Sequence, residues 1–367
     1  MTGDIPSGIA YVGSRTSQQR DGLGVGLTVY RTGLPGTPWT QIQVVSCDNP
    51  SYLIFNIERS VLYCAHGDTT DLSAFAVDPN TGELTLLNRI QSEGENPVHL
   101  TLSPDGRHLI VAGHNSGTIS SHSLQDDGAI GPTVGIARMS GQPGPHRQYQ
   151  NSSKPHQVEF DPSGLFAVVP DKGLDCLFVV TIAADGGLAL DESLTVRLPE
   201  MAGPRHVRFH PTLPYLYSID EFRSTVTAYR FDRDSSRIIP LQVRSAAPDT
   251  LIDDSRGAEI AVHPNGGTIY VSNRSGAGDH TPGGDHPDTI GVFQIDTSTG
   301  RLHSPKWVET AGIRPRFFCL DGSSQIIVAH ERSHTIASHH IDEATGHPAA
   351  PRLLARTGSP VAVLLNP

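Results

Sequence analysis

A repeated unit of about fifty residues runs along the whole sequence and constrains the fold more than any other feature. Its clearest copy, GPRHVRFHPTLPYLYSIDEFRSTVTAYRFD at residues 203–232, holds three short apolar strands separated by turns. Counting this one, copies start at Pro50, Pro97, Pro155, Pro204, Gly257, Pro315 and Pro360, at steps of 47, 58, 49, 53, 58 and 45 residues. A repeat of this length with three or four strands predicts a β-propeller with one repeat per blade.

The last copy predicts how the ring closes. It spans only residues 360–367, which is enough for one strand. Near the N-terminus, IAYVGSR, LTVYR and TQIQVV supply the three strands that this copy lacks. We therefore expect an all-β, seven-bladed β-propeller that occupies residues 1–367 as a single domain, with the first blade completed by the C-terminal strand.

Composition narrows the class of protein and of partner. Lys and Arg number 27 and Asp and Glu 38, so the net charge of 27 − 38 = −11 disfavours nucleic acid or an anionic membrane as partner. The start MTGDIPSG lacks the features of a secretory signal, and no apolar run reaches 18 residues. Four widely spaced cysteines are expected to be free thiols in a reducing, cytoplasmic location: Cys47, Cys64, Cys176 and Cys319.

Antiparallel pairing places the start of each first strand and the end of each second strand at the same end of the ring. These positions should therefore surround one mouth of the central channel. Many of them are ionisable. At the ends of the second strands the residue pairs are Ser14-Arg15, His66-Gly67, His114-Asn115, Asp171-Lys172, Asp220-Glu221, Asn273-Arg274 and His330-Glu331.

Four long irregular segments are expected to open onto the same mouth. Segments 139–154 and 245–256 precede a first strand, whereas 15–25 and 275–287 follow a second strand. Long loops in a compact domain are usually functional or disordered. Because all four loops are expected at the same end of the ring, we interpret that end as a binding face.

A group of charged residues at this mouth predicts an anion-binding site. One charged residue at a strand end is usually only solvated, but several cations directed at one concave spot repel one another unless acids or a ligand anion neutralise them. The predicted catalytic residues are His156, Arg205, Glu221 and Arg274, and the predicted substrate-binding residues are His99, Lys172, His206, Glu259, Arg316 and His330.

Two roles remain open for Glu221. It is either the structural counter-ion of the arginines, with a lowered pKa, or an acid or base that works with His156. Histidine titrates near neutral pH and can transfer a proton in either direction. The residues alone do not separate these roles.

Two patterns in the chain resemble metal sites. HERSH at residues 330–334 matches the HExxH zinc motif, which requires a helix, but here it ends one strand and begins the next. Asp279, His280, Asp285 and His286 lie in a segment rich in Gly and Pro that is better interpreted as a solvated loop. We expect no metal and no cofactor. The sequence also lacks the GxSxG elbow of serine hydrolases and a Walker-type phosphate loop.

The segments SKPHQVEFDPSG, GPRHVRFHP, YSIDEFRSTVTAYRFD, AEIAVHPNG with YVSNRS, and RPRFF resemble the lactonase family of seven-bladed propellers, which includes 6-phosphogluconolactonases and carboxy-cis,cis-muconate cyclases. The resemblance implies a metal-independent site at the channel mouth, with family site residues falling on His156, Arg205, Arg274 and Glu221. The chain departs from the family at the rim: Arg15 replaces a frequent Tyr, His66-Gly67 a usual Asn-Glu pair, His114 a Tyr, and His330-Glu331 a frequent Asn-Gln pair.

Three hypotheses follow. The first is a lactone hydrolase similar to 6-phosphogluconolactonase, acting on an anionic sugar lactone by attack of water at the ring carbonyl. The second is a cycloisomerase that acts on a muconate-like dicarboxylate. The third is a non-catalytic propeller scaffold that binds a protein partner.

Overall fold

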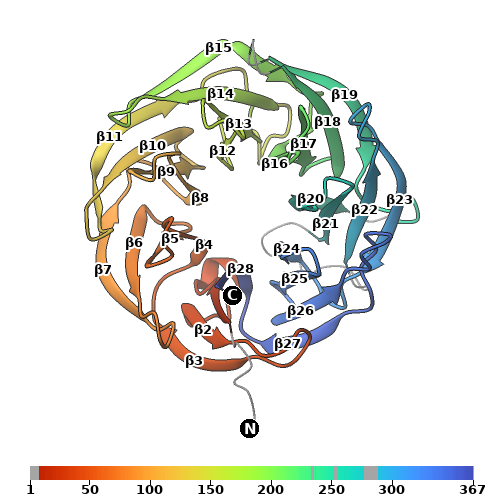
Figure 1. Ribbon diagram of the computed structural model, residues 1–367. Coiled ribbons are helices and arrows are strands. Elements are labelled where there is room, and N and C mark those ends of the chain that lie inside the picture. The colour runs from red at the N-terminus through yellow and green to blue at the C-terminus, as the bar shows by residue number, and fades with distance from the viewer. Residues whose placement is uncertain (1–7, 233–234, 236, 252–253, 277–287, 367) are drawn as a thin grey trace.

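The computed structural model describes residues 8–232, 235, 237–251, 254–276 and 288–366, which form a ring of seven four-stranded antiparallel sheets (Figure 1). The predicted all-β, seven-bladed propeller is thereby confirmed. Within these ranges the helical content is one 3-10 turn, η1 (Gln18–Arg20), and no helix is long and apolar enough to cross a membrane.

The strands of each blade are given from the channel outward. The first blade consists of β28 (Pro360–Asn366), β1 (Ile9–Ser14), β2 (Leu27–Arg31) and β3 (Thr40–Val45). The second and third consist of β4 (Pro50–Phe55), β5 (Val61–His66), β6 (Asp71–Val77) and β7 (Leu84–Gln91), and of β8 (Pro97–Leu102), β9 (His108–Gly113), β10 (Thr118–Leu124) and β11 (Ile130–Arg138).

The fourth and fifth blades consist of β12 (Glu159–Phe160), β13 (Ala167–Asp171), β14 (Cys176–Ile182) and β15 (Leu188–Arg197), and of β16 (Pro204–Phe209), β17 (Tyr215–Asp220), β18 (Thr225–Asp232) and β19 (Arg237–Ser245). The sixth and seventh consist of β20 (Ser255–Val262), β21 (Thr268–Ser275), β22 (Thr289–Ile295) and β23 (Leu302–Glu309), and of β24 (Pro315–Asp321), β25 (Gln325–His330), β26 (Thr335–His340) and β27 (Arg352–Arg356).

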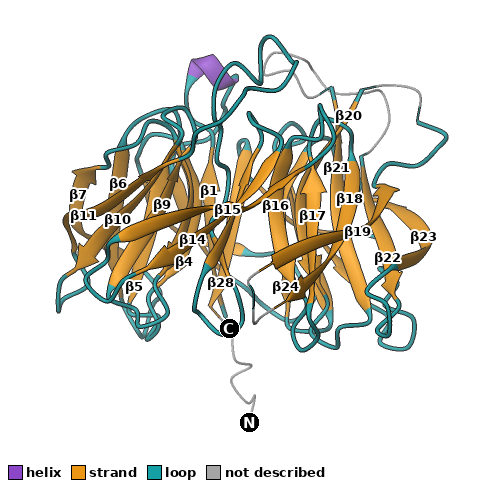
Figure 2. Cartoon of the chain, turned by 90° about the horizontal axis from the view of Figure 1, so that it is seen from above, coloured by secondary structure: helices purple, strands orange, loops and turns teal. Residues whose placement is uncertain are grey.

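The C-terminal strand completes the first blade, as the short last repeat predicts. β28 pairs antiparallel with β1, with Tyr11 opposite Leu364 and Ile9 opposite Asn366. This pairing puts the two ends of the described chain into one sheet and covers the inner edge of β1, which closes the ring. Figure 2 shows η1 and the longer connections at one end of the ring and the C-terminus at the other.

The apolar core lies between neighbouring blades. Tyr11 and Val29 of the first blade, for example, are fully buried in one cluster with Leu53, Leu62 and Phe75 of the second. A tyrosine in the second strand of four blades also donates a hydrogen bond to a glycine carbonyl in an outer turn of the next blade. The pairs are Tyr11 with Gly82, Tyr63 with Gly128, Tyr217 with Gly300 and Tyr270 with Gly346, at 2.7–3.1 Å. These contacts fix the spacing of the blades around the channel.

The innermost strand of the fourth blade is shorter than the repeat predicts. Only Glu159 and Phe160 form the ladder of β12, and Pro155 makes an isolated bridge to Asp171. Between them, the backbone N–H of His156 donates to the carbonyl of Pro170 at 3.0 Å, while the Gln157 side chain accepts from the N–H of Val207 in the next blade at 2.5 Å. Bonds to the neighbouring blade therefore replace part of the ladder and hold His156 at the channel mouth.

Candidate active site

The residue pairs identified at the ends of the second strands lie where each strand ends and the following turn begins. The second residue faces the channel in six blades, where Arg15, Asn115, Lys172, Glu221, Arg274 and Glu331 line one cavity of about 200 Å³, called here the mouth cavity. The first residue turns into its own blade in the fifth and seventh blades, whereas His114 of the third blade also lines the mouth cavity and contacts the carbonyl of Pro155 in the fourth blade. Asp220, for example, accepts hydrogen bonds from the hydroxyls of Ser218 and Thr227 at 2.7 and 2.6 Å.

β-bulges at the mouth end of the innermost strands direct further side chains into the channel. In β16 the register shifts between Pro204 and His206, so Arg205 is the extra residue, and the same shift in β24 makes Arg316 the extra residue. Arg205 lines a narrow space deeper in the channel, and Arg316 lines both this space and the mouth cavity. The predicted arginines of two separate blades therefore face the same channel.

Glu221 lies at the centre of a buried ionic group formed by Lys172, Arg205, Glu221 and Arg274, called here the Glu221 cluster. Its Oε2 lies 2.6 Å from Lys172 Nζ and 3.4 Å from Arg205 Nε, and its Oε1 lies 3.4 Å from Arg274 Nη2. All four residues are at least 91% buried. Arg205 Nη1 also donates to the carbonyl of Ala258, and Arg274 Nη2 donates to that of Gly257. Three cations from three blades are thus fixed around one carboxylate.

The charges of the Glu221 cluster shift the pKa values of its members. Burial alone would raise the pKa of Glu221, but Lys172, Arg274 and Arg205 outweigh it and hold that pKa well below its usual value. Burial lowers the pKa of Lys172 to about 8, against the opposing effect of Glu221. Glu221 is therefore a carboxylate at neutral pH and a weak base, and the cluster keeps an excess of positive charge.

His156 faces this positive charge from the fourth blade. It is 3% exposed, it lines both the mouth cavity and the deeper space, and its Nδ1 has no hydrogen-bond partner. Burial, followed by Arg205 and Lys172, lowers the pKa of His156 well below 6.5. The imidazole is accordingly neutral at pH 7 and able to accept a proton.

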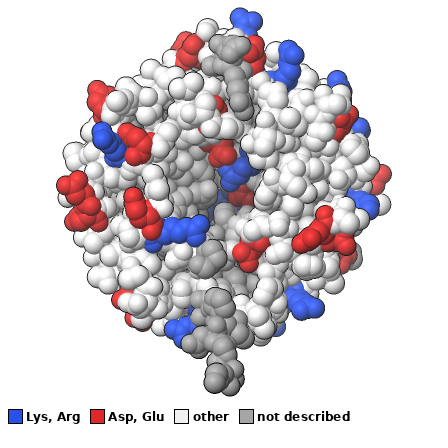
Figure 3. Space-filling model, viewed as in Figure 1, with Lys and Arg blue, Asp and Glu red and all other residues white. Residues whose placement is uncertain are grey.

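Deeper in the channel lies a second ionic group. His206 Nδ1 lies 2.7 Å from Glu259 Oε1, and Arg208 pairs with Glu159 at 2.6 Å. The space that His206 and Glu259 line measures only about 10 Å³, too small for a sugar. Figure 3 shows the face that carries the C-terminus, opposite to the mouth, where the ring is hollowed at its centre and side chains of both charges gather. His206 and Glu259 therefore support the wall of the mouth cavity from beneath.

Two of the predicted substrate-binding residues lie behind the cavity wall. His99 is 3% exposed and packs against Tyr52 with the rings tilted and their centroids 4.2 Å apart. His330 is fully buried with its Nδ1 3.1 Å from the Thr335 hydroxyl. Neither lines the mouth cavity or the deeper space. His330 is the first residue of its pair and turns into its blade, so we expect no direct contact of either histidine with a ligand here.

Several lining residues were not singled out from the sequence. Gln148 and Tyr149 come from the long segment 139–154, and Arg20 comes from segment 15–25, so both loops contribute to the mouth cavity. Arg256 lies over the ring of Tyr149 at 4.6 Å and lines the cavity too. The loop lengths indicated that these segments cover the mouth, but only the folded chain shows which side chains turn inward.

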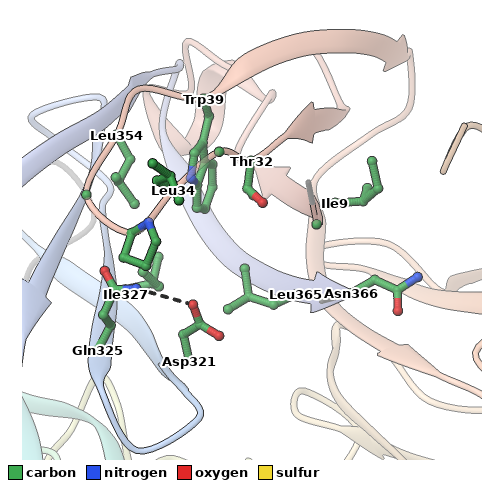
Figure 4. Close-up of a pocket in the computed structure, with 14 residues that line it drawn as sticks. Ile9, Thr32, Leu34, Trp39, Asp321, Gln325, Ile327, Leu354, Leu365 and Asn366 are labelled. Atoms are coloured by element: carbon green, nitrogen blue, oxygen red, sulfur yellow. Dashed lines mark hydrogen bonds between the residues drawn. The ribbon is translucent and has the colours of Figure 1, made fainter. Parts of the chain in front are cut away.

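A second cavity, of about 250 Å³, lies at the seam between the seventh blade and the first (Figure 4). It opens near the β24–β25 turn and the end of β28, away from the mouth. Its described walls are mainly apolar, with Trp39, Leu354 and Leu365, and carry one carboxylate, Asp321, without a cationic side chain. This cavity offers no group suited to acid-base chemistry on an anion, so the mouth cavity is the candidate active site.

The HERSH segment is not a helix, which confirms its interpretation as a strand end and a turn. His330 ends β25, whereas His334 has a φ of 56° and accepts a hydrogen bond from the N–H of Ser359. Asp279, His280, Asp285 and His286 lie outside the described residues. Among the residues that are described, no three His, Cys, Asp or Glu side chains are arranged to hold a metal ion.

Comparisons with known proteins point to one family. The family described as "Lactonase, 7-bladed beta-propeller" matches residues 9–365. A 6-phosphogluconolactonase of Bacillus subtilis is 31% identical over 302 residues, which cover 81% of this chain and 82% of that protein. A 6-phosphogluconolactonase of Formosa agariphila is 28% identical over 346 residues, which cover 92% of this chain and 93% of that protein. The periplasmic gluconolactonase PpgL of Pseudomonas aeruginosa shares the fold, with a TM-score of 0.88 over 98% of this chain and 99% of that one at 24% identity.

Proposed function

The chain belongs to the lactonase family of seven-bladed β-propellers, and we propose that it is a lactone hydrolase, similar to 6-phosphogluconolactonase, that acts on an anionic sugar lactone. The observation that carries this proposal is the position of a neutral histidine, His156, beside the excess positive charge of the Glu221 cluster in one cavity. A small anion can supply the missing negative charge there.

The chemistry follows from these groups. His156 takes a proton from a water molecule, whose oxygen attacks the carbonyl carbon of the ring ester. Arg205 and Arg274 stabilise the oxyanion that develops, because their charges are fixed in place before the reaction starts. When the tetrahedral intermediate collapses, the bond to the ring oxygen breaks, and the protonated His156 returns the proton to the leaving alkoxide. The product is an open-chain hydroxy acid.

Glu221 has a different role in this scheme. Its lowered pKa makes it a poor base, and both of its oxygens already contact cations. We assign it as the counter-ion that allows Lys172, Arg205 and Arg274 to be buried side by side.

Replacing Arg205 by Ala tests the proposal. We expect kcat/KM for hydrolysis of 6-phosphogluconolactone to fall on the order of 10²-fold, the usual cost of losing one donor to an oxyanion. The matched control is Arg223→Ala, because Arg223 is exposed and lies outside the cavity wall in the turn that follows Glu221. Rates must be corrected for spontaneous lactone hydrolysis. Turnover of carboxymuconate without lactone hydrolysis by the unmodified protein would instead identify a cycloisomerase.

The pH dependence of kcat/KM should be bell-shaped. His156 must be neutral to act as a base, and its pKa is lowered, so activity should be lost only as pH falls below 6.5. Lys172 must be protonated to hold positive charge at the site, and its pKa of about 8 places the basic limb near pH 8. Lys172→Arg should move the basic limb upward because arginine stays protonated. A basic limb that does not move in this variant would contradict the role of Lys172.

We infer a cytoplasmic location from the thiols. All four cysteines are free, and burial raises the pKa of Cys47 to about 11 and that of Cys176 to about 11. Widely spaced free thiols without a disulfide are usual in a reducing compartment. The periplasmic location in the name of PpgL indicates that the fold itself does not fix the compartment.

A further inference from the structure

We propose that Arg15 and Arg316 form a second anion site in the mouth cavity, separate from the Glu221 cluster, and that this site binds the phosphate monoester of a phosphorylated lactone. The proposal rests on the function proposed above for the identity of the ligand. The second anion site is formed by the first, second and seventh blades and would select the substrate. His156 and the Glu221 cluster, which would carry out the reaction, come from the fourth, fifth and sixth blades.

Arg15 presents an unsatisfied donor. The residue is 2% exposed and lines both the mouth cavity and the deeper space. Its Nη1 lies 3.3 Å from Asp68 Oδ2, but its Nε is buried and has no hydrogen-bond partner. A buried N–H of a charged group without a partner is costly, and turning of the guanidinium toward a ligand oxygen would relieve that cost. Burial, followed by Arg316 and Arg20, lowers the pKa of Arg15 to about 10, so the side chain is charged at neutral pH.

Gly67 of the second blade leaves the space that Arg15 occupies. A Cβ atom at Gly67 would lie 2.6 Å from Arg15 Nη1 and 2.9 Å from Ser51 Oγ. Of the seven residues at this repeat position, Gly67 alone has no side chain. The guanidinium of Arg15 therefore fills a position that a side chain of the second blade would otherwise take, and even an alanine there must push it away.

Arg316 is the second cationic residue of the proposed anion site. It lines both the mouth cavity and the deeper space, and within the described part of the chain its side chain makes no hydrogen bond or close ion pair. Glu331 is the nearby acid. Burial opposes its ionisation, but Arg316 and then Arg15 lower its pKa below the usual value. One carboxylate thus faces several guanidinium groups on this side of the mouth.

The balance of charge leaves room for a dianion. Among the described residues, the wall of the mouth cavity carries two acids, Glu221 and Glu331, and eight cations: Arg15, Arg20, Lys154, Lys172, Arg256, Arg274, Arg314 and Arg316. Asp68 and Asp254 pair with some of these cations. Even without Arg20 and Arg314, six described cations stand against four described acids, which leaves a positive excess of two. A phosphate monoester carries close to two negative charges near pH 7, and guanidinium groups bind its oxygens through paired N–H donors.

The test compares Arg316→Gln and Gly67→Ala with the unmodified protein. Arg316→Gln removes a charge, whereas Gly67→Ala keeps every charge but displaces Arg15. We expect each variant to weaken binding of inorganic phosphate, measured by calorimetry, by tenfold or more, as expected for lost charge-assisted hydrogen bonds. We also expect the ratio of kcat/KM for 6-phosphogluconolactone to that for unphosphorylated gluconolactone to fall by a similar factor. Arg223→Gln, at the same end of the ring but outside the cavity, should change neither quantity.

The outcomes separate this site from the proposed function. If the unmodified protein hydrolyses neither lactone but the two variants still weaken phosphate binding, the second anion site stands and the lactonase function fails. If the lactones are hydrolysed and both variants bind phosphate and select between lactones as the unmodified protein does, the site is refuted. If only Arg316→Gln weakens phosphate binding and lowers the selectivity, and Gly67→Ala does neither, Arg15 is not part of the second anion site.

Discussion

Replacing His156 by Asn should lower kcat for lactone hydrolysis by about 10²- to 10⁴-fold, the range usual for loss of a general base. Asparagine keeps a polar side chain at the cavity wall but accepts no proton at working pH. The lowered pKa of His156 also predicts how the residual rate behaves. The acid limb of the pH profile should disappear in the variant, because the group that titrates there is gone. Measurement of kcat between pH 4 and 9, corrected for spontaneous hydrolysis, checks both results.

A second buried histidine separates a catalytic from a structural effect. His122 is fully buried in the third blade, where its ring nitrogens contact the hydroxyls of Ser120 and Thr133, and it lines neither the mouth cavity nor the deeper space. His122→Asn should lower stability with kcat retained in the folded fraction. His156 is not the base if His156→Asn keeps kcat and the acid limb and loses only stability.

The ring and the location of the candidate site follow from the repeat, because period and alternation are local properties of a sequence. The eight residues from Pro360 predict the pairing of β28 with β1, which the structure confirms. Alignment of the seven repeats also predicts that His156, Arg205, Glu221 and Arg274 lie at one end of the channel. The structure brings these four residues together there.

Which member of a strand-end pair faces the channel is not visible in the repeat. A step of one residue exchanges the side chain that faces the channel for one that faces the blade. The bulges in β16 and β24 likewise decide that Arg205 and Arg316 enter the channel, and the repeat does not reveal them. His330 was expected to contact substrate, but it turns into its blade, while its neighbour Glu331 lines the cavity. The contact between Gly67 and Arg15 was not predictable either, since it depends on how two blades pack.

Replacing Glu221 by Gln should destabilise the protein by about 3–5 kcal/mol in phosphate-free buffer, because three buried cations lose their shared counter-ion. The amide can accept a hydrogen bond but carries no charge to offset Lys172, Arg205 and Arg274. Phosphate should restore part of the loss, since an anion bound among these cations stabilises the folded state by mass action, by about 2.7 kcal/mol at one hundred times its Kd. The free energy of unfolding, from denaturant titration with and without phosphate, measures both effects.

Glu221→Asp is the matched control, because it keeps the charge and shortens the side chain by one methylene group. It should retain most of the stability that Glu221→Gln loses. The pKa of Glu221 is lowered in the folded protein, so its contribution to stability is fully present above its ordinary value of 4.5 and is lost only as pH falls toward the folded value. If Glu221 were instead the catalytic base, Glu221→Gln would lose kcat at unchanged stability, and phosphate would stabilise it no more than the unmodified protein. Protection of Glu221→Gln by phosphate beyond that of the unmodified protein is the result that the counter-ion role requires.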